Sequence, residues 1–219
     1  MLLPKFDEST KQIGAILAAK AAEKPPAAGA HPLKTELLQL CRAVTAGTLD
    51  AGKLCDLLAN PELLPEAARP VVQSTLADVF WFLGVEMEAG VGKEDAKAQL
   101  VGLIKELLRE KVVDDKLLLT RLDGPMLQLF VDAVAQIVLE GEDVVDDDSD
   151  GELDIDAAFD ILDHLHRVDR FAIVFMFAGE EEKKQLTRTL SAMKRIRSRD
   201  SRFSDKAVTT LAAKYGIKI

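Results

Sequence analysis

The feature that most constrains this chain is the spacing of its apolar residues, which recur every three or four positions from residue 33 onward. An α-helix turns once in about 3.6 residues, so this spacing places the apolar side chains on one helical face. The first clear set consists of Leu33, Leu37, Leu40, Cys41 and Val44. Glycine and proline interrupt the pattern between successive sets, and they predict short turns between helices.

We therefore expect an all-α fold, either an irregular helical bundle or a HEAT-like stack of helix pairs without an exact repeat. The run Phe171–Phe177 is apolar throughout and is expected to be a central helix, because a lone strand would have no partner. The other expected helices cover residues 7–23, 33–47, 48–60, 70–88, 93–111, a short segment after Asp114, Pro125 to about Leu139, 180–197 and 204–216.

The chain is expected to have four segments. They are an N-terminal docking helix with its Pro/Ala linker (1–31), a helical domain (32–139), an acidic loop (140–154) and a C-terminal helical region with a basic tail (155–219). The first helix has a thin apolar face, and Pro25 and Pro26 follow it. It either frays or docks on a partner protein, and its predicted partner-binding anchors are Ile13, Ile16 and Leu17.

Composition excludes several classes of protein. Hydrophobic residues make up 48% of the chain and charged residues 30%, which is too apolar for a disordered protein. Two cysteines cannot build a disulfide framework, so a reducing compartment is expected. No apolar run reaches the roughly 18 residues needed to cross a bilayer, and no targeting pattern opens the chain. We expect an intracellular protein without membrane insertion, whose partners are other protein subunits.

Residues 146–157 resemble much of an EF-hand loop. Aspartates stand at loop positions 1, 3, 5 and 9, and a glycine stands at position 6: Asp146, Asp148, Asp150, Asp154 and Gly151. Position 12 holds Ala157 instead of the bidentate glutamate, and the preceding helix is expected to end early, near Glu140. The favoured interpretation is a solvated acidic loop with no cofactor, and a weak Ca²⁺ site is the alternative.

A basic stretch near the C-terminus contains Arg195, Arg197, Arg199 and Arg202. Such a stretch can contact phosphates, which leaves nucleic-acid binding open as an alternative. It is not the favoured one, because the net charge of the chain is −9 and no aromatic side chains interleave these arginines.

Residues that could support catalysis are poorly arranged. His164 and His166 are two positions apart, so a helix would point them about 200° from each other. Cys41 and Cys55 lie on apolar helix faces and are expected to be buried thiols. No phosphate-binding glycine loop is present in the sequence. We therefore expect a protein that is not an enzyme.

Residues 32–122 resemble the N-terminal helical segment of the large scaffold subunit of the THO complex, which couples transcription to mRNA packaging and export. The resemblance is carried by Pro32-Leu33-Lys34, the run Leu40–Leu49, the run Leu76–Trp81, Leu107-Leu108 and the run Leu117–Asp123. It implies a subunit of an RNA-processing or export assembly and a nuclear location. Without it, the expected location is cytoplasmic or organellar. No functional residue is carried over, because that segment is not catalytic.

These observations together favour a non-enzymatic helical scaffold or adaptor subunit of a larger protein assembly. The alternatives from other classes are an EF-hand-like module that responds to Ca²⁺ and a nucleic-acid-binding accessory protein that uses the basic C-terminal helix.

Overall fold

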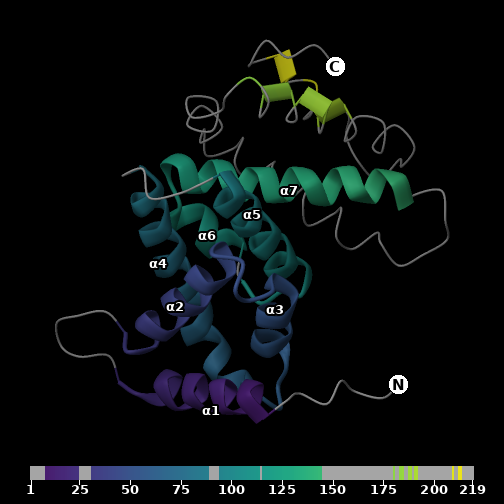
Figure 1. Cartoon of the computed structure of the whole chain (residues 1–219). Helices are drawn as coiled ribbons and strands as arrows, with labels where there is room; N and C mark the ends of the chain where they lie inside the picture. The colour runs from purple at the N-terminus through teal and green to yellow at the C-terminus, as the bar shows by residue number, and fades with distance from the viewer. Residues whose placement is uncertain are drawn as a thin grey trace. The chain divides into compact units, whose positions relative to one another are not determined.

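The structure, a computed structural model, describes residues 8–24, 31–88, 94–113 and 115–144 and short pieces between 180 and 213. These residues form helices and turns, with no strand among them, which confirms the predicted all-α class (Figure 1). The helices are α1 (Glu8–Ala22), α2 (Leu33–Thr45), α3 (Ala51–Ala59), the 3-10 helix η1 (Glu66–Ala68), α4 (Arg69–Glu88), α5 (Glu94–Arg109), α6 (Asp115–Arg121) and α7 (Gly124–Val144).

The chain divides into two compact units, residues 1–122 and residues 123–219. The sequence predicts segment boundaries after residues 31, 139 and 154, and these stay predictions. The first unit therefore includes α1 together with α2–α6, and the second unit begins one helix earlier than the predicted acidic loop.

The first unit has a leucine-rich core. In this unit α2 packs against α4 and α5, α3 against α5, and α4 against α6. Each helix contributes the apolar face that the spacing predicts, and the largest fully buried side chain of α4 is Phe80. The fully buried leucines include Leu33, Leu37, Leu54, Leu58, Leu64, Leu76 and Leu100.

The turn from α2 to α3 uses Gly47 and Asp50. Gly47 has φ +70°, and the backbone N–H of Thr48 donates to the carbonyl of Ala43 at 2.9 Å, which closes α2 as the sequence predicts. The sequence also predicts Thr48 as the cap of the next helix, and this prediction is wrong. Its hydroxyl donates back to the carbonyl of Ala43, whereas the Asp50 carboxylate accepts the backbone N–H of Lys53 at 3.0 Å. Asp50 takes the capping position because its backbone is extended where the helix begins.

Replacing this cap gives a first test of the local structure. Asp50→Ala removes the acceptor for the Lys53 N–H and should lower the free energy of unfolding by about 1 kcal/mol. Thr48→Ala should cost only a few tenths of a kcal/mol, because its hydroxyl lies outside the helix that it was predicted to cap. Urea denaturation of both variants measures the difference. Equal losses would show that Asp50 does not act as the cap.

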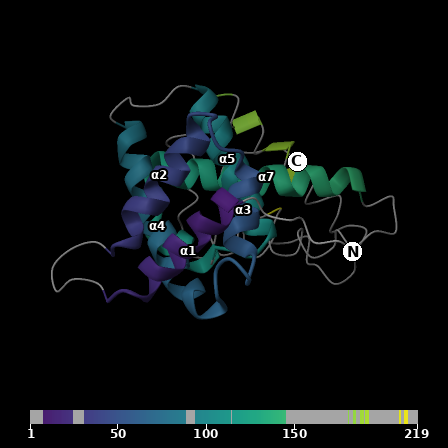
Figure 2. The same ribbon diagram turned by 60° about the horizontal axis from the view of Figure 1, so that its bottom comes forward.

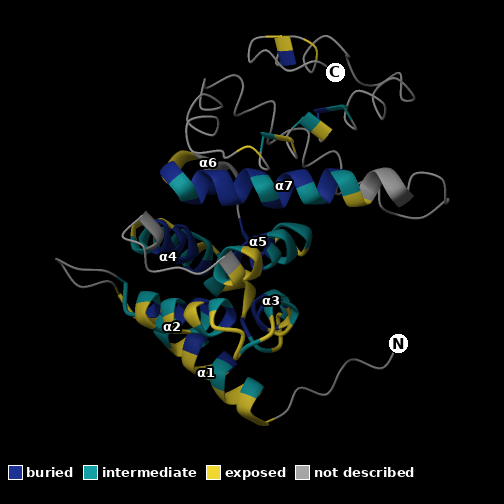
Figure 3. Cartoon of the chain, turned by 45° about the horizontal axis from the view of Figure 1, so that its top comes forward, coloured by how far each residue is buried: buried dark blue, intermediate teal, exposed yellow. Residues whose placement is uncertain are grey.

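The N-terminal helix α1 lies on α2, α3 and η1 of its own unit (Figure 2). Gly14, Leu17 and Ala21 form its buried stripe, and the rest of the helix is largely exposed (Figure 3). A Cβ at position 14 would approach the Cβ and the carbonyl oxygen of Leu63 to 3.1 Å, so Gly14 allows α1 to lie close to Leu63. The helix predicted to dock on a partner thus already has a docking surface within the chain.

The second unit is described mainly by α7. Its apolar side chains are buried around most of the helix: Met126, Leu127, Leu129, Phe130, Val131, Val134, Ile137 and Val138. The helix runs to Val144, whereas the sequence predicted an end near Leu139 and a loop from residue 140. The acidic residues after Leu139 were predicted to form a loop. Glutamate is a good helix former, however, and residues 140–144 continue the helix. Within the described residues, no helix has both the length and the apolar character required to cross a bilayer.

Candidate protein-interaction surface

One side of α4 exposes large apolar side chains in its C-terminal half. Trp81 is 44% exposed and Val85 is 42% exposed, and the two lie one helical turn apart. Trp81 is the single tryptophan of the chain. Tryptophan combines a large apolar area with few rotatable bonds, and it is enriched among the residues that carry binding energy at protein interfaces.

Ion pairs from two neighbouring helices flank this pair of side chains. Arg42 of α2 donates to the carboxylate of Glu86, and Arg121 of α6 donates to the carboxylate of Asp78. These pairs are partly exposed, so each contributes at most about 1 kcal/mol to stability. Their effect is to fix α4 against α2 and α6. We call Asp78, Trp81, Phe82, Val85 and Glu86 the Trp81 face.

Phe82 supports the α2 side of the Trp81 face. The Lys34 Nζ lies 5.4 Å from the centre of the Phe82 ring, and the Arg42 guanidinium carbon lies 5.9 Å from it. Both distances allow a cation–π attraction between the ring and α2. Because Arg42 also binds Glu86, the charged groups around the face are held in place before any partner arrives.

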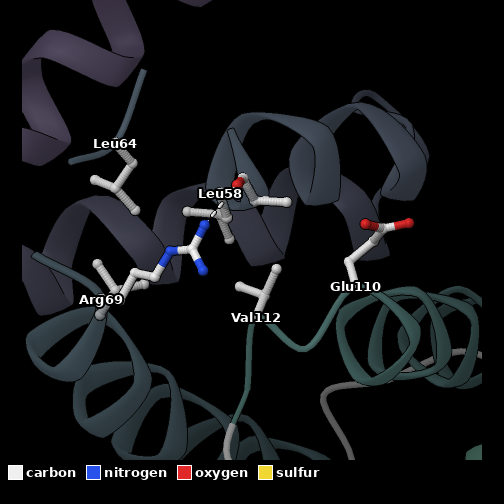
Figure 4. Close-up of a pocket in the computed structure, with 7 residues that line it drawn as sticks. Leu58, Leu64, Arg69, Glu110 and Val112 are labelled. Carbon is white, nitrogen blue, oxygen red and sulfur yellow. Dashed lines mark hydrogen bonds between the residues drawn. The ribbon is translucent and has the colours of Figure 1, made fainter. Parts of the chain in front are cut away.

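A small depression opens elsewhere in the first unit, among Leu58, Leu64, Val72, Val112, Arg69 and Glu110 (Figure 4). The Arg69 guanidinium reaches over it and donates from Nη2 to the Ala59 carbonyl at 3.1 Å. The depression has a cavity volume of about 10 Å³, far below the roughly 300–1,000 Å³ of typical small-molecule sites. It therefore does not suit a substrate or cofactor of ordinary size.

The two cysteines are buried, as the sequence predicts. Burial raises the pKa of the Cys41 thiol to about 12. Burial also raises the pKa of the Cys55 thiol to about 12, and the negative charges of Glu110, Glu106 and Asp56 add to this shift. A thiol with such a pKa stays protonated near neutral pH, so neither cysteine is suited to act as a nucleophile.

The predicted partner-binding anchors of the N-terminal helix differ in their exposure to solvent. Leu17 is 1% exposed in contacts with the chain itself, so it cannot serve as a partner anchor while α1 is docked. Ile16 is 48% exposed, and Ile13 is half-buried. The structure therefore leaves only Ile16 and part of Ile13 accessible from the predicted set.

The other predicted sites lie outside the described residues. They are the acidic set Asp146, Asp148, Asp150 and Asp154, the basic set Arg195, Arg197, Arg199 and Arg202, His164 and His166, and the apolar run 171–177. One argument against the EF-hand-like loop is corrected, because α7 runs at least to Val144, the last residue described before Asp146. The other argument, Ala157 at position 12, is unchanged.

Sequence reasoning missed the Trp81 face. In the apolar spacing of residues 70–88, Trp81 and Phe82 widen the apolar arc of the helix, and this pattern predicts that more than one face is covered. The helical positions did contain a signal, because Asp78, Trp81 and Val85 share a face at three- and four-residue spacing, and a charged residue on a face argues for exposure. The ion pairs that flank the face join residues more than 40 positions apart in sequence, so no local pattern indicates them.

Comparison with known families adds one finding. The family model described as the potential Monad-binding region of RPAP3 matches residues 94–183. The match covers less than half of the chain and includes α5, α6 and α7. No curated protein and no solved structure gives a significant match.

The matched family is a protein-binding region and not an enzyme family, which supports the coarser prediction of an adaptor with protein partners. The comparisons do not show the resemblance of residues 32–122 to the THO scaffold subunit. A role in RNA processing is likewise not shown.

Proposed function

We propose that this protein is a non-enzymatic adaptor that binds another protein through the Trp81 face of α4 and the segment that the family model matches, residues 94–183. The match of residues 94–183 to a potential Monad-binding region carries the proposal. Monad, named in the description of that family, is accordingly the first candidate partner. The scaffold role predicted from the helix pairs agrees with this function, and no RNA-processing step is needed for it.

The Trp81 face is a second observation that supports the proposal. Arg121, at the end of α6, lies within the matched segment and binds Asp78 of the face. This ion pair therefore joins the matched segment to the Trp81 face within the first unit. In the described part of the matched segment, the large apolar side chains of α5 and α7 are mostly buried, and Trp81 and Val85 are the nearest exposed ones along the chain. We assign the apolar centre of the partner contact to these two residues.

Intrinsic fluorescence tests this assignment directly, because Trp81 is the single tryptophan. Purified Monad in which every tryptophan is replaced by phenylalanine is titrated into the full chain, so that only Trp81 fluoresces as tryptophan. The exposed Trp81 emission should shift to shorter wavelength as the partner covers it, and the shift should saturate. An emission that stays constant while calorimetry detects binding would place the contact elsewhere.

The matching variant is Trp81→Ala. It should weaken Monad binding by at least about 30-fold, because truncating a central aromatic anchor typically costs about 2 kcal/mol or more. Ile16→Ala is the matched control, since it removes a similarly exposed apolar side chain from α1 and should leave the affinity unchanged. Equal effects of the two variants would contradict a role for the Trp81 face, and no binding by the parent chain would contradict Monad as partner.

An EF-hand-like role remains the second candidate, favoured by the extension of α7 at least to Val144, two positions before Asp146. Ala157 at position 12 removes the bidentate ligand of such a loop. Any Ca²⁺ affinity should therefore fall well below that of sensor EF-hands, whose Kd is roughly 10⁻⁷–10⁻⁵ M. Calorimetric titration with Ca²⁺ separates this role from the adaptor role, which needs no metal.

A further inference from the structure

One positive charge beside the Trp81 face has no acidic partner. The two ion pairs that flank the face bring together two arginines and two acids, so their charges cancel. Lys34 of α2 is different, because its ammonium lies in no ion pair with any residue that the structure describes. Its Nζ lies instead 5.4 Å from the centre of the Phe82 ring. The α2 side of the face therefore has an uncompensated positive charge.

The position of Lys34 within α2 indicates that its charge does not serve the stability of that helix. Lys34 is the second residue of α2, which begins at Leu33. The aligned peptide dipoles give the N-terminal end of a helix a partial positive charge, so a cation in the first turn is unfavourable. The Phe82 ring attracts the ammonium, but the Arg42 guanidinium lies 5.9 Å from the centre of the same ring and supplies a second cation there. The charge of Lys34 is thus left for a group outside the chain.

An acidic side chain is the partner chemistry that fits this arrangement. Trp81 and Val85 offer exposed apolar area, and the ammonium of Lys34 is held next to them over Phe82. A carboxylate that meets this ammonium while the apolar side chains are being covered leaves bulk water, where charge attraction is weakest. A basic side chain in the same place would meet a like charge.

We propose that Lys34 is a specificity-determining residue of the partner contact, and that the partner segment bound at the Trp81 face places an aspartate or glutamate side chain beside its apolar residues. This inference rests on the proposed function, because it names the chemistry of the partner at the same face. The net charge of the chain is −9, which opposes the approach of an acidic segment in most orientations. The local positive charge of Lys34 favours the one orientation in which the acid meets the face.

Charge reversal at Lys34 in the full chain tests the proposal. At low salt, Lys34→Glu should weaken the binding of purified Monad by at least about 10-fold, because the acid of the partner then meets a like charge. Lys53→Glu is the matched control, since it changes the net charge by the same amount at an exposed position of α3, outside the Trp81 face. Its effect should stay below about 3-fold, because salt screens charges that lie away from the contact. Equal effects of the two variants would overturn the proposal.

Salt dependence separates a contact with the partner from a structural role of Lys34. The affinity of the parent chain for Monad should fall as salt rises, and that of Lys34→Glu should fall less, since its ammonium–carboxylate attraction is gone. Lys34→Glu should keep the melting temperature of the parent, because an acid is favourable in the first turn of a helix. Lys34→Met, which retains an apolar side chain, should show a smaller loss of affinity in the same direction.

The outcomes distinguish this inference from the function on which it rests. An identical salt response of the parent chain and of Lys34→Glu would overturn the inference. So would an affinity that Trp81→Ala lowers and that Lys34→Glu leaves unchanged, although the proposed function would then stand. No binding of Monad by the parent chain would contradict the proposed function and this inference together.

Discussion

Phe80→Ala should lower the free energy of unfolding by about 3–5 kcal/mol, the usual cost of removing a fully buried phenylalanine side chain. Phe80 is completely buried in α4, which packs against both α2 and α6. Whole domains are stable by only about 5–15 kcal/mol, so the melting temperature should fall by about 6–20 °C.

Phe82→Ala is the matched control for this prediction. It removes the same side chain two positions along the same helix, but Phe82 is half-buried beneath Lys34 and Arg42. Its cost should stay below about 1.5 kcal/mol, because only part of its area leaves water on folding. Thermal denaturation of both variants decides the point. A loss for Phe82→Ala as large as that for Phe80→Ala would contradict the assignment of the core.

Alkaline pH should destabilise the protein through its two thiols. The native pKa of Cys41 and of Cys55 is about 12, against 9.0 for an ordinary thiol. Between these values the unfolded chain loses thiol protons that the native chain retains, so the unfolded state binds fewer protons and stability falls as pH rises. The loss approaches about 1.4 kcal/mol per pH unit for each thiol, or about 2–3 kcal/mol per thiol between pH 9 and 11.

The double variant Cys41→Ala/Cys55→Ala isolates this effect. Lysine and tyrosine side chains titrate in the same pH range in both proteins, so only the thiol contribution differs between them. The variant should be less stable at pH 7, because two buried side chains become smaller. Its stability should decline less steeply above pH 9 than that of the parent chain. Denaturant titrations at pH 8–11 that give parallel declines would contradict the buried, protonated state of the two thiols.

The sequence was sufficient to predict the helices of the first unit, because their apolar spacing is regular. Leu33, Leu37, Cys41 and Val44 form the buried face of α2 as predicted. The start of α3 was less predictable, since Thr48 and Asp50 are both good capping residues and only the backbone path decides between them. The predicted helix 93–111 extends two residues past the end of α5 at Arg109, because Lys111 takes a positive φ of 52° where glycine is usual.

Relations between distant residues limited the prediction of function. The thin apolar face of α1 suggested that this helix binds a partner protein. In the structure it packs instead on α2, α3, η1 and the turn at Leu63, and a local sequence pattern does not reveal these contacts. The Trp81 face was read as core because exposure depends on whether a neighbouring helix covers that side of α4. The apolar residues of a helix identify candidates for burial, and tertiary packing decides which of them remain exposed.

Hydrogen exchange on the full chain, alone and with saturating Monad, tests the adaptor assignment most directly. Binding should slow exchange in α4 around Trp81 and in the described part of the matched segment, residues 94–144. The amides of α3, which lies outside both, should exchange at unchanged rates. No slowing anywhere, or slowing that spares both α4 and the matched segment, would contradict the claim that this protein is an adaptor acting through these surfaces.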